Sequence, residues 1–264
     1  MTADARDLDA LLATALTAAE TGVAVVQAGL GAAERVESKG PGDWVSEIDV
    51  ASEHAVREVL TTAWPDLPFF GEESGGERGE VGWFVDPLDG TTNFLHGLPS
   101  VGVAIALVEG NRPVVGVVAA PLLGEVYAAR LGGGATRNGA PVRVSDRSPD
   151  AAICATGFPF RNKQRLDPFL GTFEAVLRSV EDIRRVGAAS MDLAWTGSGV
   201  FDGYFELSLG TWDVAAGGLI VREAGGVVTD WRGDDEQWLW TGDVVAGNPV
   251  VHAHLVEITT QFRG

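Results

Sequence analysis

Three short apolar runs in the first half of the chain constrain the fold more than any other feature of the sequence. They are Trp83–Val85, Val101–Val108 and Val114–Ala120, and each one ends at turn residues. Runs of this length between turn residues predict buried strands rather than helices. The Glu109-Gly110-Asn111 connection between the second and third runs is typical of a hairpin. The sequence therefore predicts an antiparallel sheet in this half of the chain.

Two helical patterns precede these strands. Residues Leu8 to Ala33 are rich in alanine, lack proline and carry apolar residues at helical spacing. A break at Gly40-Pro41-Gly42 is followed by a second helical pattern, which begins near Asp49 and ends before Pro65. Helices combined with an antiparallel sheet predict an α+β arrangement for the N-terminal part.

After Asp150 the pattern alternates between strands and helices, which predicts an α/β arrangement. The expected elements are a strand at Ile153–Thr156, a helix at Asp167–Val180, a helix from Trp212-Asp213 to Gly225-Gly226, and strands at Val227–Thr229 and Val244–Ala246. We divide the chain into an N-terminal lobe of residues 1–146 and a C-terminal lobe of residues 147–264, which together form one continuous unit.

The charge balance excludes several classes of partner. The 264 residues include 19 basic and 37 acidic side chains, a formal net charge of −18, so the mean field repels nucleic acid and anionic lipid. The first residues lack the basic start of a signal peptide, and apolar runs such as Val101–Val108 are far shorter than the roughly 20 residues that span a bilayer. We predict a cytoplasmic protein without nucleic-acid or membrane partners, in which Cys154 is a packed small side chain.

The segment from Trp83 to Phe94 carries two aspartates, Asp86 and Asp89, at the end of an apolar strand. We expect Pro87 and Gly90 to turn the chain sharply there, so that both carboxylates and the Leu88 carbonyl face one space. Oxygen ligands of this kind suit hard divalent cations. If a helix begins after Gly90, its first amides form an anion site beside the cations. The alternative is an ordinary surface turn.

Two other acidic segments have equally ordinary alternatives. Gly71-Glu72-Glu73-Ser74 follows the apolar pair Phe69-Phe70, although a Glu-Glu pair is usually a solvated surface pair. Asp213 lies near the start of a predicted helix, where an aspartate commonly acts as an N-cap. Spacing alone leaves both interpretations open.

Taken together, these segments resemble the signatures of the inositol monophosphatase family in type and order. The matching fragments are Gly71 to Ser74, Trp83 to Phe94, Trp212 to Gly217 and Glu223 to Gly226, and the likeness runs from Lys39 to Pro249. The resemblance implies a layered αβαβα sandwich of the inositol monophosphatase and fructose-1,6-bisphosphatase type. Residues Phe158 to Lys163 resemble the bacterial inositol-1-monophosphatase branch.

The resemblance also implies a metal site and a reaction. It makes Glu72, Asp86, the Leu88 carbonyl, Asp89 and Asp213 ligands of two to three Mg²⁺ ions, with Mn²⁺ as a substitute. Thr91 and Asp49 become the pair that orients the attacking water, with Glu72 nearby. The four histidines show no zinc spacing, and hard oxygen ligands favour Mg²⁺ or Mn²⁺.

On the substrate side the resemblance implies contacts from a larger set. The segment Arg185 to Ala189 resembles one that lies against the polyol ring in the family, but here Ala188 replaces the usual hydroxyl residue and Ser190 follows Ala189. Lys39 resembles a family lysine near the metal-site entrance. The expected substrate-binding residues are Lys39, Gly90, Thr91, Thr92, Gly187, Ala188, Ala189, Glu206 and Asp213.

The leading hypothesis is a Mg²⁺-dependent phosphomonoesterase that hydrolyses myo-inositol monophosphate and functions as a homodimer. Relatives with the same acidic core hydrolyse fructose 1,6-bisphosphate, histidinol phosphate or phosphoadenosine phosphate, so these substrates remain open. The resemblance further implies inhibition by Li⁺. A metal-binding regulatory protein without turnover is a different class of hypothesis, and a glycosidase with paired carboxylates ranks last.

Overall fold

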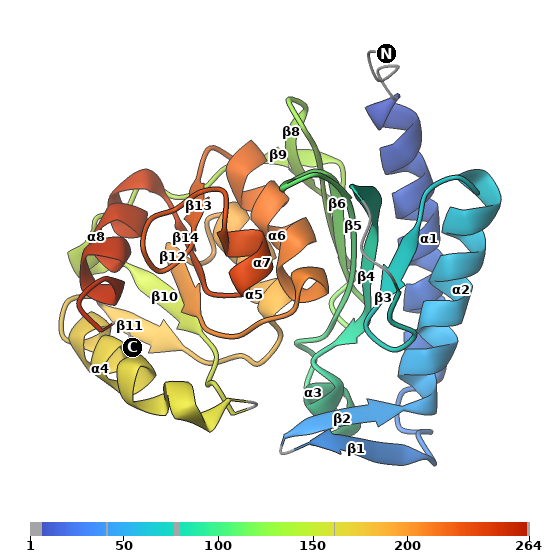
Figure 1. The fold of residues 1–264 in the computed structure, drawn as a ribbon, viewed down its shortest axis with the longest axis horizontal. Coiled ribbons are helices and arrows are strands. Elements are labelled where there is room, and N and C mark those ends of the chain that lie inside the picture. The colour runs from blue at the N-terminus through green and yellow to red at the C-terminus, as the bar shows by residue number, and fades with distance from the viewer. Residues whose placement is uncertain (1–6, 41, 77–79, 161, 263–264) are drawn as a thin grey trace.

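Two β-sheets alternate with three layers of helices across the molecule (Figure 1). The structure is a computed structural model that describes residues 7–40, 42–76, 80–160 and 162–262. Pro41 of the predicted break and residue Arg161 of the segment from Phe158 to Lys163 lie outside the described residues. The layer order is helix, sheet, helix, sheet, helix, so the αβαβα sandwich expected from the sequence is confirmed.

The first helical layer consists of α1 (Leu8–Ala28) and α2 (Glu47–Ala63), which pack on the outer face of the larger sheet. The helix α1 begins after Asp7, whose carboxylate accepts from the amides of Asp9 and Ala10. It ends five residues before the predicted Ala33, because Gly29 caps it and Gly31 adopts φ +71°. By length and composition alone α1 could cross a membrane, but here one face of it is buried against α2 and β6.

An antiparallel hairpin, β1 (Val36–Gly40) and β2 (Asp43–Ser46), connects these helices and was not predicted from the sequence. Strand β1 is almost entirely exposed, so it carries no alternating apolar pattern that would mark it as a strand. Ser46 then begins α2: its hydroxyl accepts from the Ile48 amide, while Asp49 accepts from the Ser46 amide. The start of α2 is thus close to the predicted position.

The larger sheet has seven strands in sequential order. They are β3 (Phe69–Gly71), β4 (Val81–Asp89), β5 (Gly102–Glu109), β6 (Arg112–Ala120), β7 (Glu125–Arg130), β8 (Gly134–Arg137) and β9 (Ala140–Val142). The three predicted apolar runs lie in β4, β5 and β6, and these strands are antiparallel, with Glu109 opposite Arg112 at the hairpin. The predicted antiparallel sheet is confirmed. Only β3 departs from this pattern, because it pairs with β4 in parallel.

The smaller sheet has the strand order β11-β10-β12-β14-β13. Its strands are β10 (Ile153–Thr156), β11 (Asp182–Arg184), β12 (Gly203–Glu206), β13 (Val227–Thr229) and β14 (Val244–Gly247). Helices α4 (Leu166–Leu177) and α8 (Pro249–Thr259) cover its outer face, while α7 (Trp238–Thr241) and the 3₁₀ turns η1 (Pro149–Ala151) and η2 (Lys163–Arg165) are connectors. The predicted alternation of strands and helices is therefore confirmed. The helix predicted to end at Val180 ends at Leu177.

The central layer consists of α5 (Ala189–Gly197) and α6 (Thr211–Glu223), which pack between the two sheets. Small residues allow this close packing: a methyl group at Gly116 of β6 would lie 2.8 Å from the Ala216 carbonyl oxygen. Cys154 is fully buried in β10, and burial raises the pKa of its thiol to about 12, which agrees with the expected packing role. Trp231 and Trp238 are also buried.

Asn93, in the short helix α3 (Thr91–Leu95), connects two distant parts of the chain. Its buried side-chain amide donates to the Ser100 carbonyl at 2.8 Å and the Val186 carbonyl at 2.9 Å. Asn93→Ala leaves both carbonyls without this donor, so we expect a loss of about 1–3 kcal/mol in the free energy of unfolding. Urea denaturation measures this loss. A change below about 0.5 kcal/mol, as expected for a surface residue, would contradict it.

Candidate metal and phosphate site

A β-bulge brings Asp86 and Asp89 to the same side of β4. In a regular strand, residues three apart point to opposite faces. Here Asp86 pairs with Ala104 and Asp89 pairs with Gly102, so β4 has one residue more than β5 in this interval. The predicted sharp turn at Pro87 is therefore wrong, because the strand continues to Asp89 and the chain turns at Gly90, which has φ +88°. Asp86 and Asp89 are buried, which excludes the surface-turn alternative.

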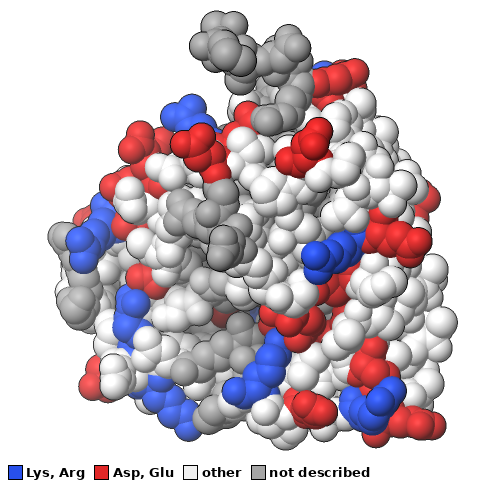
Figure 2. Space-filling model, turned by 45° about the vertical axis from the view of Figure 1, so that its right-hand side comes forward, with Lys and Arg blue, Asp and Glu red and all other residues white. Residues whose placement is uncertain are grey.

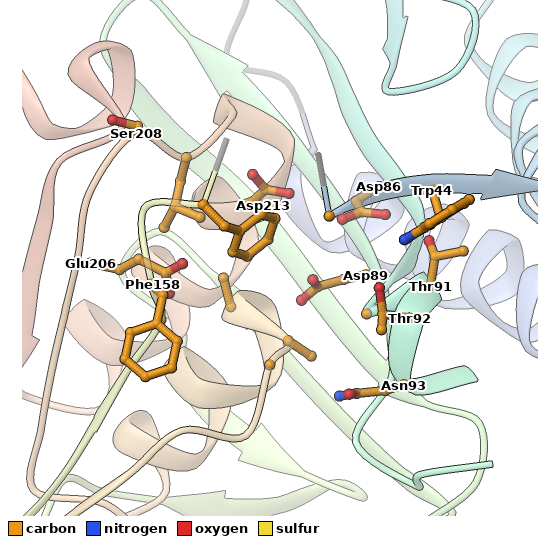
Figure 3. Close-up of a pocket in the computed structure, with 18 of the residues that line it drawn as sticks. Trp44, Asp86, Asp89, Thr91, Thr92, Asn93, Phe158, Glu206, Ser208 and Asp213 are labelled. Atoms are coloured by element: carbon orange, nitrogen blue, oxygen red, sulfur yellow. The ribbon is translucent and has the colours of Figure 1, made fainter. Parts of the chain in front are cut away.

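Three carboxylates from separate elements converge on one point. Oxygen atoms of Glu72, Asp86 and Asp213 all lie within 4.8 Å of one another. Asp86 is fully buried, and this burial, together with repulsion from Glu72, Asp89 and Asp213, raises the pKa of Asp86 well above its ordinary value. Figure 3 shows the carboxylates of Asp86, Asp89 and Asp213 around a shared space. Buried carboxylates of this density require a compensating positive charge, so the residues fit a divalent cation.

Glu72 follows β3 directly, and its amide donates to the Val85 carbonyl of β4 at 3.0 Å. Lys39 of β1 bridges Glu72 and its neighbour Glu73 at 3.0 and 2.9 Å. Burial raises the pKa of Glu73 to about 7, although the Lys39 ammonium opposes this change. Although burial opposes its charge, the attraction of Glu72 and Glu73 raises the pKa of Lys39. The Glu72-Glu73 pair is therefore part of the acidic site and not a solvated surface pair.

Asp213 is the third residue of α6 rather than its N-cap. One of its carboxylate oxygens, Oδ2, accepts from the amide of the N-cap residue Gly210 at 2.6 Å, as in a capping box. The helix α6 lies between the two sheets and packs against the larger one. Asp213 therefore reaches the cluster from the central layer, whereas Asp86 reaches it from β4. The cap interaction and a ligand role are compatible, since a carboxylate has two oxygens.

Thr91 and Asp49 form a hydrogen-bonded pair beside the acidic cluster. The Thr91 hydroxyl donates to Asp49 Oδ1 at 2.7 Å and lies 3.2 Å from the Leu88 carbonyl oxygen. The other oxygen, Asp49 Oδ2, accepts from the amide and hydroxyl of Ser46 at 2.8 and 2.6 Å. Burial raises the pKa of Asp49, while the donors from Ser46 and Thr91 oppose that change. Since Asp49 is held from both sides, it fixes the orientation of the Thr91 hydroxyl.

Ser190 contributes to the site in a way that the sequence did not reveal. Both its amide and its hydroxyl donate to Asp89 Oδ2, at 2.7 and 2.6 Å. The hydroxyl that is displaced from the usual family position at Ala188 therefore contacts an acidic residue. The position of Ser190, one residue after the expected segment, was the available signal.

We expect Ser190→Ala to raise the Mg²⁺ concentration needed for half-maximal phosphate release about 10-fold. The change removes one of two donors that hold Asp89, and loss of such supporting hydrogen bonds typically weakens metal sites 10- to 100-fold. Ser198→Ala is the matched control, because the Ser198 hydroxyl donates to the Trp195 carbonyl and Ser198 does not line the pocket. An unchanged Mg²⁺ requirement in Ser190→Ala would show that its amide alone suffices.

A pocket of about 260 Å³ opens beside the carboxylates. It brings together most of the predicted substrate-binding residues, namely Gly90, Thr91, Thr92, Gly187, Ala188, Ala189, Glu206 and Asp213, with Glu72, Asp86, Leu88 and Asp89. Lys39 and Asp49 are not among the lining residues: Lys39 contacts the two glutamates and Asp49 lies behind Thr91. Trp44 also lines the pocket and was not predicted there, since it is an aromatic residue without a polar motif (Figure 3). Phe158 lines the pocket as well, and it belongs to the segment from Phe158 to Lys163, for which the sequence left a position near the active site or at a subunit contact open.

Glu206 lies at the end of β12, across the pocket from Asp89 (Figure 3). The Tyr204 hydroxyl donates to it at 2.7 Å, which orients the carboxylate. Gly157 permits this position, because a methyl group there would overlap the Glu206 carboxylate. The pocket therefore has an acidic wall near the aspartates and a separate hydrogen-bond acceptor opposite them.

Most of the acidic excess lies outside this pocket. Figure 2 shows acidic side chains scattered over the viewed face, with basic side chains interspersed among them. The local clustering of Glu72, Asp86 and Asp213 is therefore distinct from the general charge of the protein.

The sequence and the fold both match known proteins. The sequence profile of the inositol monophosphatase family matches residues 7–262, and the chain belongs to this family. A protein of Neisseria meningitidis serogroup B that is named as a Nus factor, SuhB, is 43% identical to this chain over 230 residues. The match covers 86% of this chain and 88% of that protein.

Solved structures show the same likeness. The extragenic suppressor protein suhB from Bartonella henselae has a TM-score of 0.90 and 36% identity, covering 96% of this chain and 99% of that chain. The inositol monophosphatase from Anabaena (Nostoc) sp. has a TM-score of 0.86 and 33% identity, covering 97% of each chain. Membership in this family supports a hydrolase that uses Mg²⁺, in agreement with the acidic cluster.

Proposed function

We propose that the protein is a Mg²⁺-dependent phosphomonoesterase that acts on a small phosphorylated polyol, with inositol 1-phosphate as the leading substrate. The observation that carries the proposal is the convergence of Glu72, Asp86 and Asp213 beside the Thr91–Asp49 pair. The three carboxylates can ligate cations, and the Thr91 hydroxyl can form a hydrogen bond with a water molecule. A phosphatase without a covalent enzyme intermediate requires both.

The residues that would hold the cations are Glu72, Asp86, Asp89, Asp213 and the Leu88 carbonyl. When bound, Mg²⁺ supplies Lewis-acid polarisation of the phosphoryl oxygens and lowers the pKa of the attacking water. The protein's own contribution is to hold the carboxylates in place: Ser190 fixes Asp89, and Gly210 fixes Asp213. Mn²⁺ is expected to substitute, since it also prefers oxygen ligands.

The Thr91–Asp49 pair orients the water. Because the Thr91 hydroxyl donates a hydrogen bond to Asp49, its oxygen remains free to accept a hydrogen bond from the water. This contact directs a lone pair of the water away from Thr91 and towards the phosphorus atom. Glu72, which the family resemblance places near this pair, assists as a proton acceptor.

The phosphate group would lie at the start of α3, where the first amides of a helix have no partner within the helix. The polyol would then lie against Gly187, Ala188 and Ala189, and Glu206 would accept hydrogen bonds from its hydroxyl groups. Lys39, which contacts Glu72 and Glu73, would partly offset the negative charge at the entrance.

We also propose that the two sheets form two lobes that divide at residue 146, since β9 ends at Val142 and β10 begins at Ile153. In this proposal the chain acts in the cytoplasm as a homodimer that does not bind nucleic acid or membranes, in accord with the net charge of −18. Light scattering of the purified chain would test the dimer.

Li⁺ is expected to inhibit phosphate release, and full activity at high Li⁺ would contradict a site with three metal ions.

Phosphate release from four esters tests the proposed function. The esters are inositol 1-phosphate, fructose 1,6-bisphosphate, histidinol phosphate and phosphoadenosine phosphate, each with Mg²⁺ and with excess chelator. Mg²⁺-dependent release that favours the inositol ester supports the proposal, whereas preference for another ester assigns the chain to a sister activity. No release from any ester would overturn the phosphatase proposal.

A second candidate function follows from the name Nus factor SuhB, which several relatives carry. In this candidate the chain is a metal-binding regulatory protein without turnover. Asp89→Asn separates the two candidates, because it alters the acidic site without changing the size of the side chain. If phosphate release is lost and partner binding is unaffected, the chain has both a catalytic site and a separate binding role.

A further inference from the structure

Glu53 is a buried glutamate of α2 that lies outside the acidic cluster. Only 4% of its surface is exposed. Its two carboxylate oxygens accept from the two amides that follow Glu72 in the chain: Oε2 from Glu73 at 2.8 Å and Oε1 from Ser74 at 2.9 Å. Hydrogen bonds to a carboxylate are stronger than those to a neutral acceptor, and a buried carboxylate requires such donors around it. The loop after β3 is therefore tied to α2.

Glycine at position 71 makes this contact possible. A methyl group at Gly71 would overlap the Glu53 carboxylate, so a larger residue could not stand there without moving it. On the other side, the Glu72 amide is bonded to the Val85 carbonyl of β4. The backbone is therefore fixed on both sides of Glu72: its own amide is bonded to β4, and the amides of the next two residues are bonded to Glu53.

The same face of α2 also supports the rest of the site. Asp49, Ser52 and Glu53 are spaced i, i+3 and i+4, so they project from one side of the helix. Asp49 accepts from Thr91, and the Ser52 hydroxyl donates to the Pro87 carbonyl within the β4 bulge at 2.9 Å. One helical face therefore contacts the loop of Glu72, the bulge between Asp86 and Asp89, and the Thr91 hydroxyl.

We propose that Glu53 is a positioning residue for the metal site, which fixes Glu72 through the Glu73 and Ser74 amides. The inference rests on the proposed function, because it assumes that the acidic cluster takes a divalent cation. Glu53 itself does not line the pocket, so in this proposal it acts on the cation through the loop that carries Glu72.

Glu53→Gln tests this role, with Mn²⁺ binding as the measurement. A glutamine keeps the size of the side chain, but its NH₂ group must face one of two amide donors and cannot accept from it. We expect the Mn²⁺ dissociation constant, measured from free Mn²⁺ by electron paramagnetic resonance, to rise about 10- to 100-fold. Phosphate release should recover at saturating Mn²⁺. Glu58→Gln is the matched control, because it removes the same charge from an exposed position on the same helix.

Gly71→Ala provides a second test, since the added methyl group displaces Glu53 without removing its carboxylate. A folded Glu53→Gln variant with wild-type Mn²⁺ affinity would overturn the proposal. If that variant does not fold, Gly71→Ala decides: weakened Mn²⁺ binding supports the role, and unchanged binding overturns it. If neither folds, Glu53 is required for folding and the positioning role is overturned. Wild-type protein that binds Mn²⁺ but releases no phosphate would refute the proposed function separately.

Discussion

Asp86→Asn is expected to lower phosphate release by at least about 10³-fold and, in excess chelator, to make the protein more stable. The activity falls because Asp86 is the central carboxylate of the cluster, and metal ions supply several kcal/mol of transition-state stabilisation. Each 1.36 kcal/mol corresponds to a factor of ten in rate. The loss of even part of this contribution therefore has a large effect.

The stability of the same variant should change in the opposite direction. Burial and three neighbouring acids raise the pKa of Asp86, so its ionised form opposes folding when no cation is bound. Because the folded pKa is raised, this destabilisation is present above the raised pKa and is relieved as the pH falls through it. Asparagine removes the charge, and we expect a gain of about 1 kcal/mol at neutral pH in chelator.

The measurements are steady-state phosphate release and thermal unfolding in chelator. Asp66→Asn is the control, because Asp66 is exposed and the substitution makes the same change in charge. Retention of more than a tenth of the activity in Asp86→Asn would mean that Asp86 is not a metal ligand. A fall in stability in chelator would mean that its carboxylate has a structural role.

Thr91→Ala should lower the turnover number by about 10²- to 10⁴-fold, which is the range for loss of general acid–base assistance. The change removes the hydroxyl that donates to Asp49 and would accept from the water, while the carboxylates of the acidic cluster stay in place. The affinity for Mg²⁺ should therefore change little. Turnover measured at saturating Mg²⁺, together with Mg²⁺ titration, separates the two effects.

Thr91→Ser is the matched control, since serine retains the hydroxyl and should restore most of the turnover. The account of the water-orienting pair would be refuted by an alanine variant with wild-type turnover. It would also be refuted if serine were as inactive as alanine in a folded protein, because then the methyl group of Thr91 would matter rather than its hydroxyl.

The elements with buried, periodic side chains could be predicted from the sequence. The runs in β4, β5 and β6 are buried on both faces between helical layers, so their sequences are continuously apolar. The β1–β2 hairpin was missed because β1 faces solvent and has no such pattern. Burial produces the periodicity on which sequence analysis depends, so exposed elements give little signal.

The acidic motif at Asp86 and Asp89 could be recognised, but the local geometry could not. The sequence Asp-Pro-Leu-Asp-Gly favours a turn at Pro87, whereas pairing with β5 extends the strand and places a bulge there. Tertiary pairing overrides local turn preference in this segment. The roles of Ser190 and Glu53 depend on contacts across 101 and about 20 residues of chain, which no local pattern reports.

The most direct test of the central claim is anomalous diffraction from crystals of the protein grown with MnCl₂ and inorganic phosphate. The account predicts Mn²⁺ peaks between the carboxylates of Glu72, Asp86 and Asp213, with phosphate at the start of α3. Saturating Mn²⁺ with no peak at this cluster, or with peaks only at other acidic residues, would contradict it.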